Sequence, residues 1–226
     1  MYVLHYALDN ASLIVRYVLK SAHLPYTTAL VDRSLRQQDT PDYRALNPTG
    51  LIPTLETPHG PLSETAAILL WLSDTHALGP VPDHPLRAPF LKTLFFLSNT
   101  AHADLRQLFY PDQYVPDTAI AQHHAIITVR MRHHFALLDQ AAADHPGLFT
   151  PNGILAPYVC ALMRWSVLYP AGQAHWFDLH RFPALHVMAQ AVEATRAART
   201  VAHAEGLGDT PFTQPSNAQP PEGSAT

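Results

Sequence analysis

The sequence predicts an α/β domain followed by an all-helical domain, and three observations support this prediction. Within residues 1–78, alternating apolar residues typical of strands are interspersed with apolar residues at helical spacing. A proline-rich stretch, residues 79–85, interrupts both patterns, because proline fixes φ and lacks a backbone donor. In residues 86–209 the helical spacing continues over long runs without a convincing strand pattern. We therefore expect two domains joined by a short linker.

The first domain is expected to follow the order β-α-β, then β-β-α. Its elements are, in order, a strand at Tyr2–Tyr6, a helix at Ala11–Leu24, a strand at Thr27–Val31, a polar loop and a turn at 47–50, a hairpin of 51–56 and 62, and a helix at Ala66–Asp74. The second domain is expected to contain helical segments at 86–109, 118–143, 155–169 and 182–203. Residues 210–226 are rich in Pro, Gly, Ser and Ala, so we expect a disordered tail.

Composition excludes several classes of protein. The net charge of -4, with 14% charged residues, does not favour binding to nucleic acid. A secretion signal is not recognisable, and uncharged apolar runs are too short to span a membrane, so we expect a soluble, cytoplasmic protein. The single cysteine, Cys160, lies in an apolar helical run and is expected to be buried and inert.

Residues 47–74 carry the most informative pattern. Pro53 stands where a strand should begin, and proline there removes a ladder donor. A cis Ile52–Pro53 bond would turn the backbone groups of Ile52 outward to pair with an extended, peptide-like ligand. The alternative is an ordinary trans proline at a strand edge.

A second pattern follows, where Ser63-Glu64-Thr65 meets the start of a helix. Free N–H groups and the helix dipole can hold a carboxylate there, and Glu64 could hold an amino group of the same ligand. The alternative is a plain helix cap made by Thr65.

Together these residues resemble the glutathione transferases, whose first domain typically shows N-P-x-G-x-[VI]-P-x-L, a short hairpin, then L-x-E-[ST]-x-A-I. The match runs through Asn47, Pro48, Gly50, Ile52, Pro53, Leu55, Leu62, Glu64, Thr65, Ala67 and Ile68. The resemblance implies a thioredoxin-like first domain, an all-helical second domain, a homodimer, and glutathione as co-substrate. It also implies that Ile52 and Pro53 pair with the cysteinyl part of glutathione, whereas Glu64 and Thr65 hold its γ-glutamyl end.

The residue that would activate the glutathione thiol is expected in the segment 6–12. A hydroxyl or amide at the start of the first helix can stabilise a thiolate by hydrogen bonding. Ser12 is the first candidate and Asn10 the second, while Tyr6 would serve if the site resembled the tyrosine-using classes. Ala11 falls where the bacterial beta class keeps a cysteine, so mixed-disulfide chemistry through that cysteine is excluded. The alternative for Ser12 is a helix cap.

Three further residues are weaker candidates. The spacing of His102 before Leu108 and Phe109 resembles a beta-class stretch whose histidine faces the active site. Arg36 or Gln38 could contact the glycyl carboxylate of glutathione.

No metal is expected, because the paired histidines at 123–124 and 133–134 would lie about 15 Å apart along a helix.

These patterns lead to the hypothesis of an enzyme that attaches glutathione to a small, electrophilic, largely apolar molecule. A glutathione-dependent peroxidase or disulfide reductase is one alternative. A non-catalytic relative that binds glutathione or another protein is the other. No motif identifies the acceptor.

Overall fold

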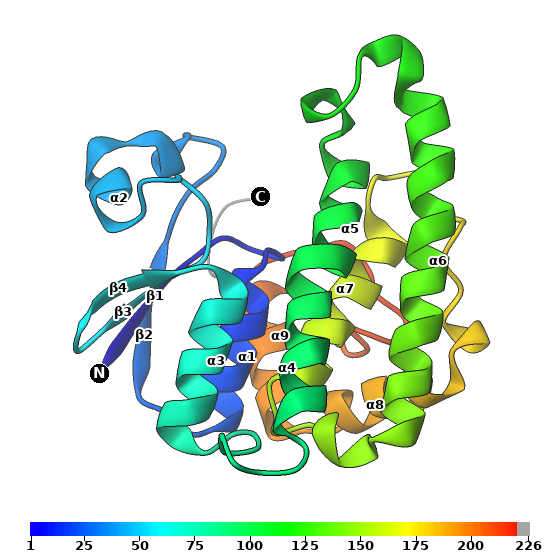
Figure 1. Cartoon of the computed structure of the whole chain (residues 1–226). Coiled ribbons are helices and arrows are strands. Elements are labelled where there is room, and N and C mark those ends of the chain that lie inside the picture. The colour runs from blue at the N-terminus through cyan, green and yellow to red at the C-terminus, as the bar shows by residue number, and fades with distance from the viewer. Residues whose placement is uncertain (221–226) are drawn as a thin grey trace.

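A four-stranded sheet forms the N-terminal part of the computed structural model, which describes residues 1–220 (Figure 1). Parallel pairing joins β1 to β2, and antiparallel pairing joins β1 to β3 and β3 to β4. The sheet order is therefore β2-β1-β3-β4. The strands are β1 (Tyr2–Tyr6), β2 (Tyr26–Leu30), β3 (Thr54–Thr57) and β4 (Gly60–Ser63).

Three helices accompany this sheet, namely α1 (Ser12–Ser21), α2 (Pro41–Leu46) and α3 (Thr65–His76). The short helix α2 lies in what was predicted to be a polar loop. It forms because Thr40 accepts a hydrogen bond from the Tyr43 N–H and Pro41 occupies the first turn, where no backbone donor is needed.

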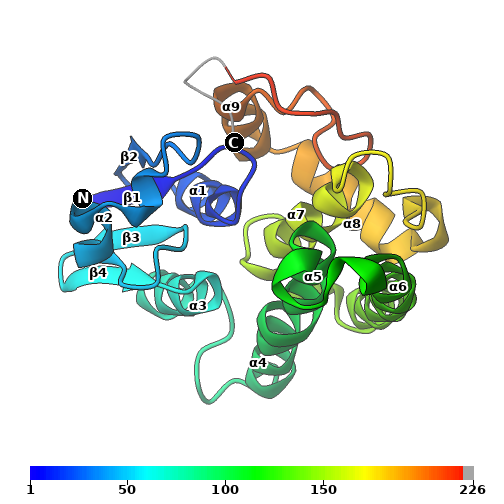
Figure 2. The same cartoon turned by 90° about the horizontal axis from the view of Figure 1, so that it is seen from above.

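Helix α1 is buried on nearly all sides, because it lies between the sheet and the second part of the molecule (Figure 2). It packs against β1 and α3 within its own domain and against the later helices α7 and α9. The loop 7–11, which joins β1 to α1, consequently lies at the junction of the two domains.

The C-terminal part is helical, which confirms the predicted fold class of an α/β domain followed by an all-helical one. Its helices are α4 (Arg87–Phe96), α5 (His102–Phe109), α6 (Ile120–Asp144), α7 (Leu155–Leu168), α8 (Pro183–Glu193) and α9 (Arg196–Glu205). A π-helical turn at Leu97–Ala101 joins α4 to α5. Helix α7 is central, and every residue from Leu155 to Ser166 is buried, including Cys160.

The predicted helix at 182–203 is divided into two. Thr195 has an extended ψ of 150°, and its hydroxyl accepts a hydrogen bond from the Ala198 N–H. A threonine in this conformation caps a new helix, which explains why α8 ends before it and α9 begins after it.

The expected disorder of the tail is wrong for residues 210–220. Phe212 is buried, and the Glu193 carboxylate accepts hydrogen bonds from the N–H groups of Phe212 and Thr213 and from the Thr213 hydroxyl. These bonds, with one buried aromatic ring, hold a segment whose composition alone predicts disorder. Residues 221–226 lie outside the described residues. Among the helices of residues 1–220, none combines the length and apolarity needed to cross a membrane.

Candidate active site

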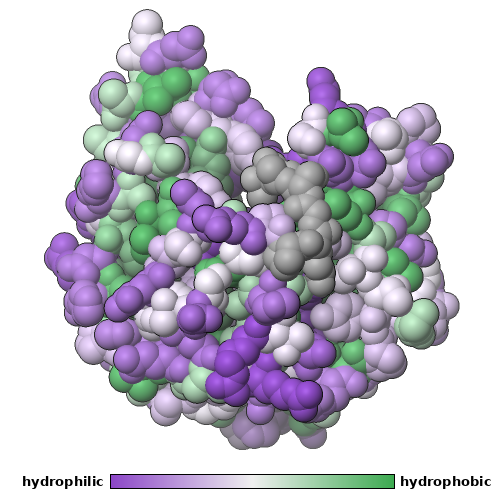
Figure 3. All heavy atoms as spheres, turned by 180° about the vertical axis from the view of Figure 1, so that it is seen from behind, coloured by the Kyte–Doolittle hydropathy of each residue, from purple (hydrophilic) through white to green (hydrophobic). Residues whose placement is uncertain are grey.

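A cleft of about 750 Å³ opens between the two domains. From the N-terminal domain it is lined by the loop after β1, the segment from α2 to β3, and the start of α3. From the helical domain it is lined by α5 and the end of α7. The space-filling view from behind shows the surface hollowed at the top between the two lobes (Figure 3).

The Ile52–Pro53 peptide bond in the wall of this cleft is cis, so the alternative of a trans proline is wrong. The turn before it is held by the Tyr43 hydroxyl and the Asn47 amide, which both donate to the Leu51 carbonyl at 2.7 Å. Gly50 has a φ of +69°, and a Cβ atom there would meet the Gln38 carbonyl at 3.0 Å. The conformation of this turn therefore requires glycine.

Glu64 and Thr65 lie at the start of α3, and both line the cleft. Glu64 has a φ of +68° and occupies the cap position, but it makes no side-chain capping bond. Thr65 is the first residue of the helix, so the alternative in which its hydroxyl caps the helix is wrong. The first-turn N–H groups of α3 consequently keep their donor capacity beside the cleft, which suits them to an anionic ligand.

Ser12 does not reach the cleft, contrary to the first prediction for a thiol-activating residue. Its side chain is fully buried, and its hydroxyl donates to the Ala7 carbonyl at 2.8 Å while accepting from the Ala7 N–H at 3.3 Å. Ser12 therefore closes the loop between β1 and α1. Tyr6 is also buried, with its ring 5.1 Å from the Arg16 guanidinium, and it does not line the cleft.

Asn10, the second candidate, does line the cleft. Its side-chain oxygen Oδ1 is buried and has no hydrogen-bond partner within residues 1–220. An amide in this position, in the loop that precedes α1, can present a donor to a thiolate. Of the three candidates in this segment, the structure brings Asn10 alone to the cleft.

The residue before it, Asp9, is the centre of a buried polar network. Its carboxylate accepts two hydrogen bonds from Arg164, at 2.8 and 2.9 Å, and one each from Trp165 Nε1 and the Tyr169 hydroxyl, both at 2.9 Å. Neither Asp9 nor Arg164 has any exposed side-chain surface. Asp9 adopts a φ of +46°, so the network fixes a left-handed turn directly before Asn10.

A second buried carboxylate supports the same loop from α9. Glu205 accepts a hydrogen bond from the Asp9 N–H at 3.0 Å and lies 3.4 Å from an Arg16 nitrogen. Burial raises the pKa of Glu205 to about 7, and the positive charge of Arg16 opposes this rise. Arg164 also donates to the carbonyls of Pro211 and Ser216, which ties the C-terminal segment to the same network.

His102 lines the cleft on α5 and shares a hydrogen bond of 3.0 Å with the Tyr158 hydroxyl. Its ring centroid lies 5.5 Å from that of Trp165. Burial, and then the charge of Arg106, lower the pKa of His102 to about 4, so its imidazole is neutral at pH 7. Burial and the nearby charge of Glu64 raise the pKa of Tyr158, which therefore stays protonated.

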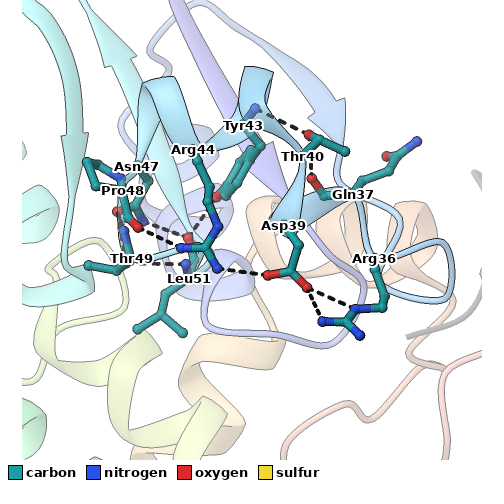
Figure 4. A network of polar contacts seen from close by, with 10 residues as sticks. All are labelled: Arg36, Gln37, Asp39, Thr40, Tyr43, Arg44, Asn47, Pro48, Thr49 and Leu51. Carbon is teal, nitrogen blue, oxygen red and sulfur yellow. Dashed lines mark hydrogen bonds and ion pairs between the residues drawn. The ribbon is translucent and has the colours of Figure 1, made fainter.

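The two candidates for the glycyl carboxylate differ in position. Gln38 lines the cleft, whereas Arg36, which pairs with Asp39 and has a side chain that is 79% exposed, does not (Figure 4). Asp39 also pairs with Arg44 at 2.9 Å, and hydrogen bonds from both arginines lower its pKa. Arg44, unlike Arg36, lines the cleft, and it donates to the Pro48 carbonyl.

Comparison with known proteins finds similarity to one family. A family profile described as the glutathione S-transferase N-terminal domain matches residues 11–75. A glutathione S-transferase of Xanthomonas campestris is 28% identical over 202 residues, which cover 87% of this chain and 95% of the relative. These matches support assignment to the glutathione S-transferase family. A maleylacetoacetate isomerase of Aspergillus fumigatus is 26% identical over 220 residues, 91% of each chain.

Solved structures show the same glutathione S-transferase fold. A glutathione transferase homologue from Sulfitobacter, solved with bound glutathione, has a TM-score of 0.72 and 22% identity, and the match covers 89% of this chain and 96% of the other. Within residues 1–220 no group of three or more His, Cys, Asp or Glu side chains is arranged to hold a metal ion.

The sequence did not predict the buried network around Asp9. Its main partners, Asp9 and Arg164, are 155 residues apart, so no local pattern connects them. One signal was present, since Arg164 is the single charged residue in the apolar run 155–169. A charged side chain in such a run must be paired when it is buried.

Proposed function

We propose that this protein binds glutathione in the cleft and attaches it to a small electrophile. The observation that carries the proposal is the joint presence, in one cleft, of the cis Ile52–Pro53 bond, the uncapped start of α3, and Asn10. The backbone of Ile52 would pair with the cysteinyl part of glutathione. Thr65 and the first turn of α3 would bind the γ-glutamyl carboxylate, and Glu64 the amino group. Gln38 and Arg44 would face the glycyl end.

The proposed chemistry is nucleophilic attack by the glutathione thiolate. A free thiol of this kind has a pKa of about 8.5, so only a small fraction is ionised at pH 7. The Asn10 amide, placed before the N-terminus of α1, would donate a hydrogen bond to the thiolate and lower that pKa. In substitution, a bond forms between sulfur and carbon while the leaving group departs with its electron pair. The thiol proton passes to solvent.

A glutathione-dependent isomerase is a second candidate, favoured by the similarity to the maleylacetoacetate isomerase. Both reactions begin with the same thiolate attack, but isomerisation returns glutathione unchanged. Net consumption of glutathione therefore separates the two.

By family relationship we also propose a cytoplasmic homodimer, which sedimentation and cell fractionation would test.

Titration with glutathione in a calorimeter tests the proposal. We expect the wild type to bind and Glu64→Ala to bind more weakly by about 1 to 3 kcal/mol, because a charged hydrogen bond is lost. Asp83→Ala, at an exposed carboxylate that does not line the cleft, is the matched control and should bind like the wild type. Equal affinity in the wild type and Glu64→Ala would refute the assignment. Binding without turnover would favour a non-catalytic role, and thiol exchange would favour a reductase.

A further inference from the structure

Two arginine side chains flank one tyrosine ring in the cleft wall. Arg33, in the loop after β2, donates to the Tyr110 hydroxyl at 2.8 Å. Arg106, on α5, has its guanidinium carbon 5.4 Å from the centroid of the Tyr110 ring, and it donates to the Tyr114 hydroxyl at 2.8 Å. Arg33, Arg106 and Tyr110 all line the cleft. The two domains thus each contribute one guanidinium group to the same place.

The charged groups of the cleft lining are not all paired with one another. Asp9 is paired with Arg164, and Asp39 with Arg36 and Arg44, while Glu64 lies at the start of α3. Within residues 1–220, no carboxylate forms an ion pair with Arg33 or Arg106. The charge of Arg106 extends into the cleft, because it contributes to the low pKa of His102. Two guanidinium groups that are not ion-paired with a carboxylate suit an anion.

Aromatic rings adjoin these arginines. The Phe109 ring centroid lies 6.5 Å from that of Tyr110 and 6.2 Å from that of Tyr169, and both contacts are edge to face. All three rings line the cleft. They offer an apolar surface against which a flat or hydrophobic group can pack.

The two arginines meet at a ring of the helical domain. Ile52, Glu64 and Thr65 belong to the N-terminal wall, and Gln38 with Arg44 faces the glycyl end. Arg33 and Arg106 instead meet at Tyr110, next to the rings of the helical domain. An anion bound between them would therefore come from the second substrate.

We propose that Arg33 and Arg106 bind a carboxylate of the electrophilic substrate, whose aromatic or apolar part lies against Phe109 and Tyr169. This inference rests on the proposed function and specifies its substrate class. Charge-assisted hydrogen bonds from two guanidinium groups would make the enzyme prefer an anionic acceptor over a neutral one of the same shape.

The test compares two glutathione conjugates, S-benzylglutathione and S-(para-carboxybenzyl)glutathione, by calorimetry on the full chain. Equilibrium binding is used, so the result does not depend on turnover. We expect the carboxylated conjugate to bind at least about tenfold more tightly, the ratio given by one net charged hydrogen bond. Arg106→Gln and Arg33→Gln should each reduce this preference to below about threefold, while affinity for glutathione itself is unchanged. Arg106→Lys should retain part of the preference.

Arg199→Gln, at an exposed arginine on α9, is the matched control and should keep the full preference. Equal binding of the two conjugates by the wild type would overturn the inference and leave the proposed function standing. A loss of glutathione affinity in Arg33→Gln or Arg106→Gln, with the preference intact, would also overturn it, because the arginines would then serve glutathione. Failure of glutathione and both conjugates to bind would overturn both proposals.

Discussion

Asp9→Asn is the substitution that tests the buried network most sharply. Asparagine has nearly the same shape as aspartate and tolerates the left-handed φ of +46° at this position, so the change adds little backbone strain. It removes the negative charge opposite Arg164, which has no exposed surface. It also replaces the acceptor Oδ2, to which Arg164 and Tyr169 donate, by an amide that is itself a donor.

The expected cost follows from these contacts. Removing one partner of a buried ion pair leaves an uncompensated charge and typically costs about 3 to 5 kcal/mol. For a chain of this size each kcal/mol lowers the melting temperature by about 2 to 4 °C, so we expect a decrease of about 6 to 20 °C. Because Asp9 directly precedes Asn10, we also expect weaker binding of glutathione.

Urea unfolding and calorimetric titration measure the two effects separately. Asp104→Asn is the matched control, because Asp104 is a buried carboxylate paired with Arg130 and His134 on the far side of α5. It should lower stability without changing glutathione affinity. A loss of less than about 1 kcal/mol in Asp9→Asn would refute the stabilising role. Normal affinity for glutathione in a destabilised Asp9→Asn would refute its role in positioning Asn10.

Three other predictions concern the same region. Ser12→Ala should lower the free energy of unfolding by about 1 to 3 kcal/mol, because the Ala7 backbone loses a hydrogen-bond partner. Turnover per folded molecule should be unchanged. Lower turnover would make Ser12 a candidate for thiol activation again. Folded Glu205 keeps a proton that the unfolded chain loses above pH 4.5. Its contribution to the free energy of unfolding is therefore present below pH 4.5 and lost by about pH 7. The unfolding free energy of the wild type relative to Glu205→Gln should fall by up to about 3 kcal/mol over this range, and a flat difference would contradict this. Glu193→Ala should speed proteolysis within 207–220, detected by mass spectrometry, and an unchanged rate would refute the role of that carboxylate.

The sequence indicated those features of the cleft that depend on local contacts. The turn at Asn47 and a helix start near Thr65 were expected from one short segment, whereas a cis bond before Pro53 was one of two alternatives that the pattern left open. The prediction was wrong where neighbouring residues point in different directions. Ser12 and Asn10 are two positions apart, but the left-handed turn at Asp9 directs Asn10 to the cleft and Ser12 into the core.

Contacts between distant segments could not be predicted from local patterns. Asp9 binds Arg164 on α7 and Glu205 on α9, and the N–H groups of Phe212 and Thr213 bind a carboxylate on α8. The tail has the composition of a disordered segment. Residues 210–220 are nevertheless held by their contacts with the helical domain. Similarly, the division between α8 and α9 depends on one capping threonine, Thr195, inside a continuous helical pattern.

The most direct measurement is the pKa of the glutathione thiol when it is bound in the cleft, followed by the ultraviolet absorbance of the thiolate as the pH is raised. We predict a value below about 8.5, the pKa of a free thiol, and a return toward that value in Asn10→Ala. Ser12→Ala should bind glutathione with the same lowered pKa as the wild type. A bound thiol that titrates like free glutathione would contradict the proposal that this cleft stabilises a thiolate.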